Sequence, residues 1–257
     1  RSTLFPYTTL FRSQPLIYIG YRYYETAAVE GYINYDQAVV FPFGYGLSYS
    51  NFSQRVVSQN FGDIDGEITV DVEVTNNGTT TGKDVVELYY SAPYTKGGIE
   101  KSAVVLGAFA KTGDLAPGAS QTLTLAFKVE DMASYDYKDE KAYVLEAGDY
   151  TITVQSDSHT VAEGTEPMIY TVADTIVYDE KNPRSTDAVA ATNQFDDVSG
   201  EFTDDASQTD KIRNMSRADF EGTFPTSPLG TDLMHASDAA RAGLEVEIGR
   251  ASCRERV

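Results

Sequence analysis

The residues from about Ser53 to Val172 alternate between apolar and polar side chains, and this period of two restricts the fold more than any other feature. In EITVDVEVTN, residues 67–76, every second residue is an isoleucine or valine. Side chains of a strand point alternately to opposite faces, so such a segment buries one face only. The pattern recurs in DVVELYYSA, SQTLTLAFKV and KAYVLEAGDYTITVQS, with turn residues between them at Asn77-Gly78, Pro117-Gly118 and Gly148-Asp149. The sequence therefore predicts a mainly β protein, an antiparallel β-sandwich without a convincing helix in this part.

The alternation also predicts which residues of individual strands face the core. We expect Tyr150, Ile152 and Val154 to face inward, and residues near 169–172 to add an edge strand. In residues 84–92, one face carries Val86, Leu88 and Tyr90, and the other carries Val85, Glu87 and Tyr89. The segment DMASYDY is expected to form one short helical turn at most.

Two segments of different character flank the predicted sandwich. Residues 14–52 are rich in aromatics and glycine and are too short to hold a core, so we interpret them as the last strand and exit loop of a larger α/β domain. Residues 175–247 are polar, acidic and poor in aliphatic side chains, which is typical of segments that bury little surface. Isolated apolar anchors predict a connector that lies against neighbouring domains. These anchors are Phe195, Phe202, Met215, Phe220 and Phe224.

The two ends of the chain share an unusual origin. One DNA sequence encodes TLFPYTTLFRS in the first tail, and its reverse complement encodes IGRASCRERV in the last. We interpret residues 1–13 and 248–257 as translated sequencing adapter and exclude them from the fold.

Composition excludes several classes of function. The formal charge is −19, and the two tails contribute five arginines and one glutamate, so the remainder is still more acidic. Such acidity argues against a nucleic-acid partner and is compatible with a neutral substrate. No apolar run reaches the length of a membrane span. The single cysteine, Cys253, lies in the last tail, so the chain offers no disulfide.

Three stretches of the sequence indicate a family. GYRYYE, residues 20–25, is followed by FPFGYGLSYSNF, residues 41–52. VTNNGTTTGKDVVELYYSAP covers residues 74–93, and NQFDD with MSRADFEGTFPT lies in residues 193–226. Together they resemble a β-glucosidase-like glycoside hydrolase of family 3. The resemblance covers the end of its α/β sandwich domain, its fibronectin type III-like (immunoglobulin-like) domain and a connector.

The resemblance implies a domain division and an enzyme activity. It implies an α/β sandwich remnant at 14–52, a fibronectin type III-like domain at 53–174, and a connector at 175–247 toward a (β/α)8 barrel, in a permuted domain order. The family hydrolyses β-linked glucosides, xylosides or N-acetylglucosaminides with retention, through two carboxyl groups about 5 Å apart. Neither catalytic motif occurs here, so we expect no catalytic residue, no metal and no cofactor in this chain. The segment itself is expected to be inactive and to pack on the catalytic domains of a bacterial enzyme whose compartment, cytoplasmic or extracellular, stays open.

Candidate binding residues have alternative roles. Arg22, Tyr23 and Tyr24 are weak candidates for the sugar pocket, where aromatics stack on sugar faces and arginine bonds hydroxyls. They equally suit packing of the domain end against its neighbours. An aromatic cluster further along the chain could likewise bind sugar or pack against a neighbouring domain, and we favour packing. Gly44 and Gly46 within it permit a sharp turn of the backbone. Its members are Phe41, Pro42, Phe43, Tyr45 and Tyr49.

The sequence gives less support to metal-binding and glycosylation sites than to these binding candidates. The acidic run from Asp196 to Asp210 and the DIDG segment at 63–66 lack the spacing of a calcium loop. His159 and His235 have no ligand-type residue at metal spacing in the sequence. The Asn-x-Ser/Thr triplets that begin at Asn51, Asn77 and Asn214 match the glycosylation pattern, but so short a pattern is common by chance.

Two other functions remain open at this stage. Immunoglobulin-like sandwiches also serve as carbohydrate-binding or adhesin modules without hydrolase activity. A binding module should expose a planar row of aromatics on one sheet face, whereas a brace should place its tyrosines against the flanking segments. Within the family, a β-xylosidase is the other alternative.

Overall fold

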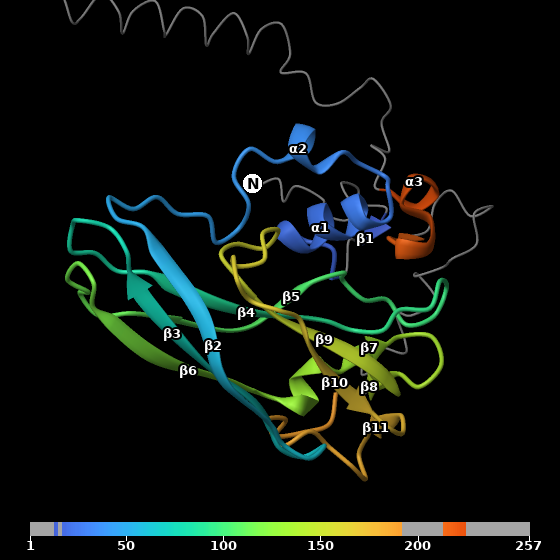
Figure 1. The fold of residues 1–257 in the computed structure, drawn as a ribbon. Helices are drawn as coiled ribbons and strands as arrows, with labels where there is room; N and C mark the ends of the chain where they lie inside the picture. Colours follow the sequence, from blue (N-terminus) through green and yellow to red (C-terminus); the bar gives the residue numbers. More distant parts are fainter. Residues whose placement is uncertain (1–12, 15–16, 192–212, 225–257) are drawn as a thin grey trace, which may run out of the picture.

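The computed structural model describes residues 13–14, 17–191 and 213–224, and these form two antiparallel sheets packed face to face with a smaller third sheet (Figure 1). The first sheet has the strand order β2-β3-β6 and the second has the order β10-β9-β4-β5. The third has the order β11-β8-β7. This confirms the predicted β-sandwich. The strands are β2 (Phe52–Phe61), β3 (Glu67–Asn76), β4 (Val85–Ser91), β5 (Val105–Lys111), β6 (Ser120–Lys128), β7 (Ser134–Asp136), β8 (Ala142–Leu145), β9 (Gly148–Gln155), β10 (Met168–Val172) and β11 (Ile176–Tyr178).

The core lies between the two larger sheets and is built from the apolar half of each alternating strand. In β3, Val72 pairs with Val56 on one side and with Leu123 on the other, so three aliphatic residues meet across the sheet. Tyr150, Ile152 and Val154 are completely buried, as predicted, and β10 is an edge strand, as predicted. Each fully buried aliphatic or aromatic side chain contributes roughly 1.5–3 kcal/mol, so this layer supplies most of the stability.

Two local features of the sandwich depend on its turns. A 3₁₀ helix at Val129–Met132 overlaps only the first two residues of DMASYDY, where a short helical turn was predicted, and residues 134–136 of that segment form β7 instead. Gly148, with φ +140°, separates β8 from β9, but these strands do not form a hairpin. Instead β8 pairs with β7 and β11, while β9 pairs with β4 and β10. The chain therefore changes sheets next to this glycine, whose φ is one that other residues adopt only with strain.

The segment before the sandwich is helical, and the predicted last strand in residues 14–52 is therefore wrong for most of that segment. It forms α1 (Tyr21–Val29) and α2 (Tyr35–Ala38), after the two-residue strand β1 (Ser13–Gln14). The aromatic residues suggested a strand, but Tyr23 and Ala27 lie one helical turn apart and contact the same apolar cluster. Tertiary packing thus overrides the strand preference of the tyrosines.

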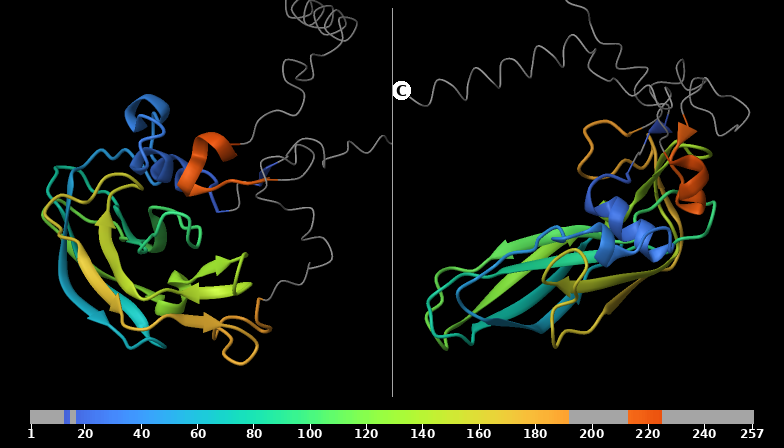
Figure 2. Two further views of the ribbon diagram at one scale, coloured as in Figure 1. Left: turned by 90° about the vertical axis from the view of Figure 1, so that its right-hand side faces the viewer. Right: turned by 90° about the horizontal axis from the view of Figure 1, so that it is seen from above.

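The segment after the sandwich returns to this helical region. It contains β12 (Arg213–Asn214), which pairs in parallel with β1, the 3₁₀ turn η4 (Arg217–Asp219) and α3 (Phe220–Thr223). Figure 2 shows α3 beside α1, above one end of the sandwich. Met215 and Phe220 are buried there with Tyr18 and Ala27, while Phe224 is partly exposed.

Several sequence predictions fall on other residues. Phe195, Phe202, the acidic run 196–210, His235, residues 1–12 and the tail 248–257 lie outside the described residues. In the described ranges, no helix combines the length and apolarity that a membrane-spanning helix needs.

Candidate functional site

Strand β4 is buried on both faces, although only one of them faces the core. The segments that bury its other face therefore indicate where the sandwich contacts the rest of the protein. Val86 and Leu88 face the core, but Glu87 and Tyr89, on the opposite face, are equally inaccessible. Residues 17–50, here called the N-flank, cover this outer face, and residues 213–224, here called the C-flank, pack on the N-flank. The candidate site is therefore the flank interface, where both flanks meet the sandwich.

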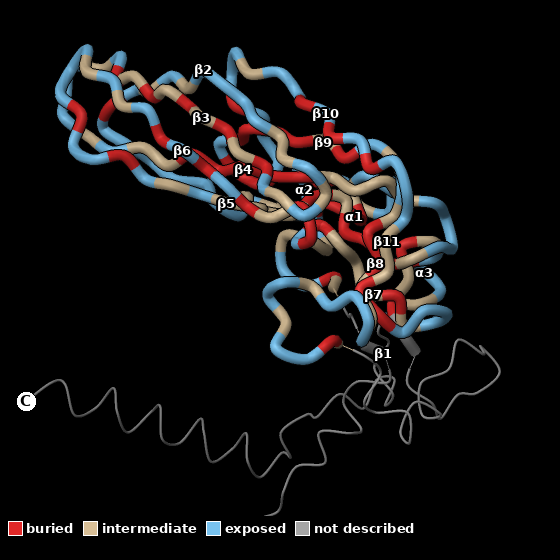
Figure 3. Tube along the Cα trace, turned by 90° about the horizontal axis from the view of Figure 1, so that it is seen from below, coloured by how far each residue is buried: buried red, intermediate tan, exposed pale blue. Residues whose placement is uncertain are grey.

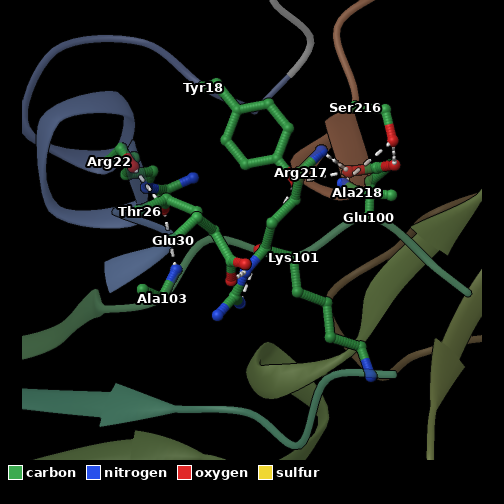
Figure 4. A network of polar contacts seen from close by, with 10 residues as sticks. All are labelled: Tyr18, Arg22, Thr26, Glu30, Glu100, Lys101, Ala103, Ser216, Arg217 and Ala218. Atoms are coloured by element: carbon green, nitrogen blue, oxygen red, sulfur yellow. Dashed lines mark hydrogen bonds and ion pairs between the residues drawn. The ribbon is translucent and has the colours of Figure 1, made fainter. Parts of the chain in front are cut away.

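A buried carboxylate, Glu100, joins both flanks to the loop between β4 and β5 (Figure 4). It is only 5% exposed. Its oxygens accept a hydrogen bond from the Tyr18 hydroxyl, one from Ser216 Oγ at 2.6 Å and one from the Arg217 backbone N–H at 2.9 Å. Burial raises the pKa of Tyr18, with Glu100 adding to the shift, so this hydroxyl stays a donor. One side chain of the sandwich thus binds the start of one flank and the turn of the other.

Arg217 adds a second connection at the same point. Its Nε donates to Glu30 Oε1 at 2.7 Å, and one terminal nitrogen donates to the Lys101 carbonyl at 3.2 Å. Its guanidinium lies over the Tyr94 ring at 4.1 Å from the centroid. A planar guanidinium suits this combination of stacking and directed hydrogen bonds. We call this set, Tyr18, Glu30, Tyr94, Glu100, Lys101, Ser216 and Arg217, the Glu100 clamp.

Lys101 anchors the clamp to the sandwich. Its Nζ donates to the Pro93 carbonyl at 2.7 Å and pairs with Glu146, which follows β8. Burial lowers the pKa of Lys101, and the Glu146 contact opposes that shift. The neighbouring backbone is also tied to α1, because the Ala103 N–H donates to Thr26 Oγ1 at 2.9 Å.

A second contact joins α1 to the loop after β9, and it changes the interpretation of His159. Glu25 is buried and accepts a hydrogen bond from Ser158 Oγ at 2.9 Å, while its other oxygen lies 2.8 Å from His159 Nδ1. The His159 ring stacks on Tyr35 with a centroid distance of 3.7 Å. The sequence analysis treated His159 as isolated, which is wrong: its partner is distant in sequence, and the arrangement links elements of the flank interface.

The aromatic segment after α2 closes the outer face of β4. Phe43 stacks on Tyr21 at 4.7 Å, and Tyr21 meets Tyr89 edge to face at 6.2 Å. Gly44 has φ +88°, and a Cβ there would lie 2.3 Å from Glu87 Oε2. Burial raises the pKa of Glu87, although the hydrogen bond from Tyr89 opposes this. Glycine is required here both by backbone conformation and by the close approach to a carboxylate.

The three predicted sugar-binding candidates lie on α1. Tyr23 packs against Phe220 and Phe224 of the C-flank, with centroid distances of 5.8 Å to each. Tyr24 is partly exposed beside a shallow groove between α1 and residues 38–43. Arg22 is half-buried, and its carbonyl accepts a bond from Thr26 Oγ1. These contacts of Tyr23 are packing contacts, and a sugar contact by Arg22, Tyr23 or Tyr24 stays a prediction.

Sequence analysis missed the residues that form the clamp. Glu100 and Arg217 of the clamp, and Glu25 of the second contact, are three of many charged side chains in the sequence, and burial sets them apart. Arg217 stood inside MSRADF, so the motif itself was the available signal. Among the described residues, no group of three or more His, Cys, Asp or Glu side chains is placed to hold a metal ion.

Comparison with known proteins shows which proteins this chain is similar to. Residues 84–158 match the model of the fibronectin type III-like domain. β-Glucosidase A of Butyrivibrio fibrisolvens is 43% identical over 150 residues, which cover 52% of this chain and 17% of the relative. β-Glucosidase of Ruminococcus albus is 40% identical over 151 residues, covering 57% and 15%. The chain therefore spans less than one fifth of these relatives.

Solved structures that resemble this chain are also β-glucosidases. The β-glucosidase of Paenibacillus barengoltzii matches with a TM-score of 0.55 and 39% identity, over 65% of this chain and 18% of that one. A family 3 β-glucosidase of Bifidobacterium adolescentis matches with a TM-score of 0.51 and 28% identity, over 62% and 21%. A putative β-xylosidase of Formosa agariphila is 33% identical over 152 residues, covering 58% of this chain and 19% of the relative. The chain is therefore similar to a segment of family 3 β-glucosidases that contains the fibronectin type III-like domain.

Proposed function

We propose that this chain is the non-catalytic brace of a retaining family 3 hydrolase that acts on β-linked glucosides. The observation that carries the proposal is the Glu100 clamp, in which one buried carboxylate of the sandwich binds both flanks. Such a contact fixes the direction in which the flanking polypeptide leaves the sandwich. The same contact supports a domain division near residues 52 and 174, with the flanks belonging to the rest of the enzyme.

The carboxylates of the flank interface support a bracing role rather than a catalytic one. Retaining hydrolysis needs two carboxyl groups open to one glycosidic bond. Glu25, Glu87 and Glu100 are instead buried and each accepts hydrogen bonds from neighbouring side chains or backbone. We therefore assign the nucleophile and the acid/base residue to polypeptide outside this chain, together with the glycoside-binding pocket.

The distribution of aromatics argues against a stand-alone carbohydrate-binding module. The outer face of the β2-β3-β6 sheet is polar: Asp71 accepts from Ser58 at 2.5 Å and from Thr124 at 2.6 Å, and Arg55 pairs with Glu73 at 2.9 Å. In the strands of the two large sheets, the exposed aromatic side chain is Phe109 alone. The buried Tyr89 faces Tyr21 of the N-flank, as a brace requires.

A turnover assay and an affinity gel test the proposal together. The purified chain is expected to release no aryl alcohol from an aryl β-glucoside or an aryl β-xyloside, because its interface carboxylates are not available to a substrate. Its mobility is expected to stay unchanged in gels that contain soluble β-glucan. Turnover would contradict the non-catalytic assignment, and retardation by the glucan would favour the binding-module alternative. The similarity to a putative β-xylosidase is the reason to include the xyloside.

A further inference from the structure

Three buried carboxylates lie close together where the N-flank meets strands β4 and β9. Glu25 of α1, Glu87 of β4 and Asp157 after β9 are 5%, 6% and 7% exposed. Figure 3 shows that β4 and β9, the strands beneath this cluster, are buried over most of their length. Burial raises the pKa of Glu87, and the charge of Asp157 adds to this shift. Burial also raises the pKa of Tyr35, to which Glu25 and Asp157 both contribute, so the three carboxylates share one region.

Positive charge is scarce around this cluster. In the part of the chain that the structure describes, His159 is the basic side chain that pairs with it. The other ion pairs of these residues involve different carboxylates. Arg22, which lies on α1 one helical turn before Glu25, takes part in none of these pairs. The remaining charged side chains of α2 and of the β9–β10 loop, residues 156–167, are exposed, and they are Asp36, Glu163 and Glu166.

His159 is fixed in orientation and still open to water. Its Nδ1 lies 2.8 Å from Glu25 Oε2, and its ring stacks on Tyr35 with an angle of 4° between the two planes. Its backbone N–H donates to Asp157 Oδ1 at 2.9 Å. The side chain is nevertheless 43% exposed, so it can exchange a proton with solvent while the interface stays closed. Because the pKa of Tyr35 is raised, a proton gained near neutral pH resides on the histidine and not on the phenolate.

A proton on His159 changes the charge balance of the buried cluster. Buried charges are costly unless an opposite charge and hydrogen bonds compensate them. A neutral imidazole offers Glu25 a neutral hydrogen bond, whereas an imidazolium forms a charge-assisted one that is roughly twice as strong. Histidine side chains change charge between about pH 5 and pH 8. The contact between α1 and the β9–β10 loop should therefore be strongest at the acidic end of this range and weaken as the pH rises.

We propose that a pH-operated latch, closed by protonation of a histidine, joins the N-flank to the β9–β10 loop. This His159 latch consists of Glu25, Tyr35, Asp157, Ser158 and His159. The Glu100 clamp does not share the property, because the guanidinium of Arg217 stays charged over the whole range. Loss of the proton thus loosens one side of the N-flank while the clamp still holds the other. The proposal does not require the hydrolase assignment, since its contacts all lie among the described residues.

Amide hydrogen exchange at Ser158 tests the latch. The Ser158 N–H donates across the interface to the Phe43 carbonyl at 2.8 Å, so its protection reports on closure. Exchange is measured by NMR on the purified chain at about pH 5 and about pH 8, the limits of the histidine range, and corrected for the intrinsic effect of pH. Protection at Ser158 should fall about fivefold or more between the two conditions, because the charge-assisted bond is replaced by a neutral one. Protection in β3, which does not contact the latch, should stay the same.

Three variants identify the group that carries the proton. His159→Asn keeps an N–H donor near the position of Nδ1 but cannot become charged, so protection at Ser158 should be equal at the two pH values. His235→Asn removes the other histidine of the chain and is the matched control, which should keep the full response. Glu25→Gln keeps the shape of the carboxylate without its charge and should also lose the response. It serves as the second test if His159→Asn does not fold.

Several outcomes would overturn the proposal. One is equal protection of Ser158 at both pH values in the unsubstituted chain. Another is a response that persists in folded His159→Asn or that His235→Asn removes. A response that Glu87→Gln abolishes and His159→Asn leaves unchanged would assign the proton to Glu87 instead. Each of these results would leave the bracing function intact, because that function depends on the Glu100 clamp.

Discussion

Replacing Glu100 by glutamine tests whether one buried carboxylate holds both flanks on the sandwich. The carboxylate accepts three hydrogen bonds, from Tyr18, Ser216 and the Arg217 backbone. Glutamine has the same shape but only one acceptor oxygen. Its NH₂ group would replace the other oxygen and would face hydrogen-bond donors instead of accepting from them. Hydrogen bonds to a charged group contribute about 1.5–3 kcal/mol each. With at least one such bond lost and a buried donor left unpaired, the C-flank should be destabilised by about 3 kcal/mol.

Amide hydrogen exchange measures this effect directly, because the Arg217 N–H is one of the donors that Glu100 binds and lies in the destabilised C-flank. Since 1.4 kcal/mol corresponds to a factor of ten, exchange at Arg217 and Ala218 should accelerate by roughly 100-fold. Exchange in β3 should change far less, because its hydrogen bonds do not involve the clamp. Glu163→Gln removes the same charge at an exposed position and serves as the control. If Arg217 exchanged within threefold of the unsubstituted protein, the clamp would not be what holds the C-flank.

Three further predictions concern the same interface. Gly44→Ala should lower the thermal midpoint, because φ is +88° and the new Cβ would meet Glu87; an unchanged midpoint would contradict the close approach. Burial raises the pKa of Glu87, so its contribution to stability is full below the unfolded pKa and is lost as pH rises through the folded pKa. Glu87→Gln should therefore be relatively more stable at pH 7 than at pH 4 in paired melts, and parallel curves would refute this. Asn76→Ala removes four side-chain hydrogen bonds of a buried amide and should cost about 3 kcal/mol or more in urea unfolding, unlike exposed Asn77→Ala.

Much of the sandwich was predictable because each strand carries its own signal. The alternation in β3 and β6 is a local property, and burial of one face follows from it. The pairing of strands was less predictable. Nothing near Gly148 in the sequence distinguishes a hairpin from a change of sheets, because that depends on what lies on either side of the turn.

The flank interface was predictable only in part. The motif resemblance indicated that residues 20–25 and 215–226 belong to domain junctions, but residues 14–52 were expected to form a last strand and an exit loop. Their helix exists because Tyr23 and Ala27 pack on Met215 and Phe220, which lie nearly 190 residues later in the chain. A contact over that separation leaves no periodic pattern in either segment.

The amino-acid sequence alone determined the β class of the protein, the inward-facing residues of its strands and its resemblance to family 3 β-glucosidases, because these depend on side-chain periodicity and short motifs. The tertiary structure decided the second buried face of β4, the partner of His159 and the role of Glu100. Each of these depends on side chains from distant segments that meet in a region with little water, where a charged group must find a partner. Burial distinguishes Glu25, Glu87 and Glu100, the buried glutamates of the flank interface, from the exposed acidic residues in the described part of the chain.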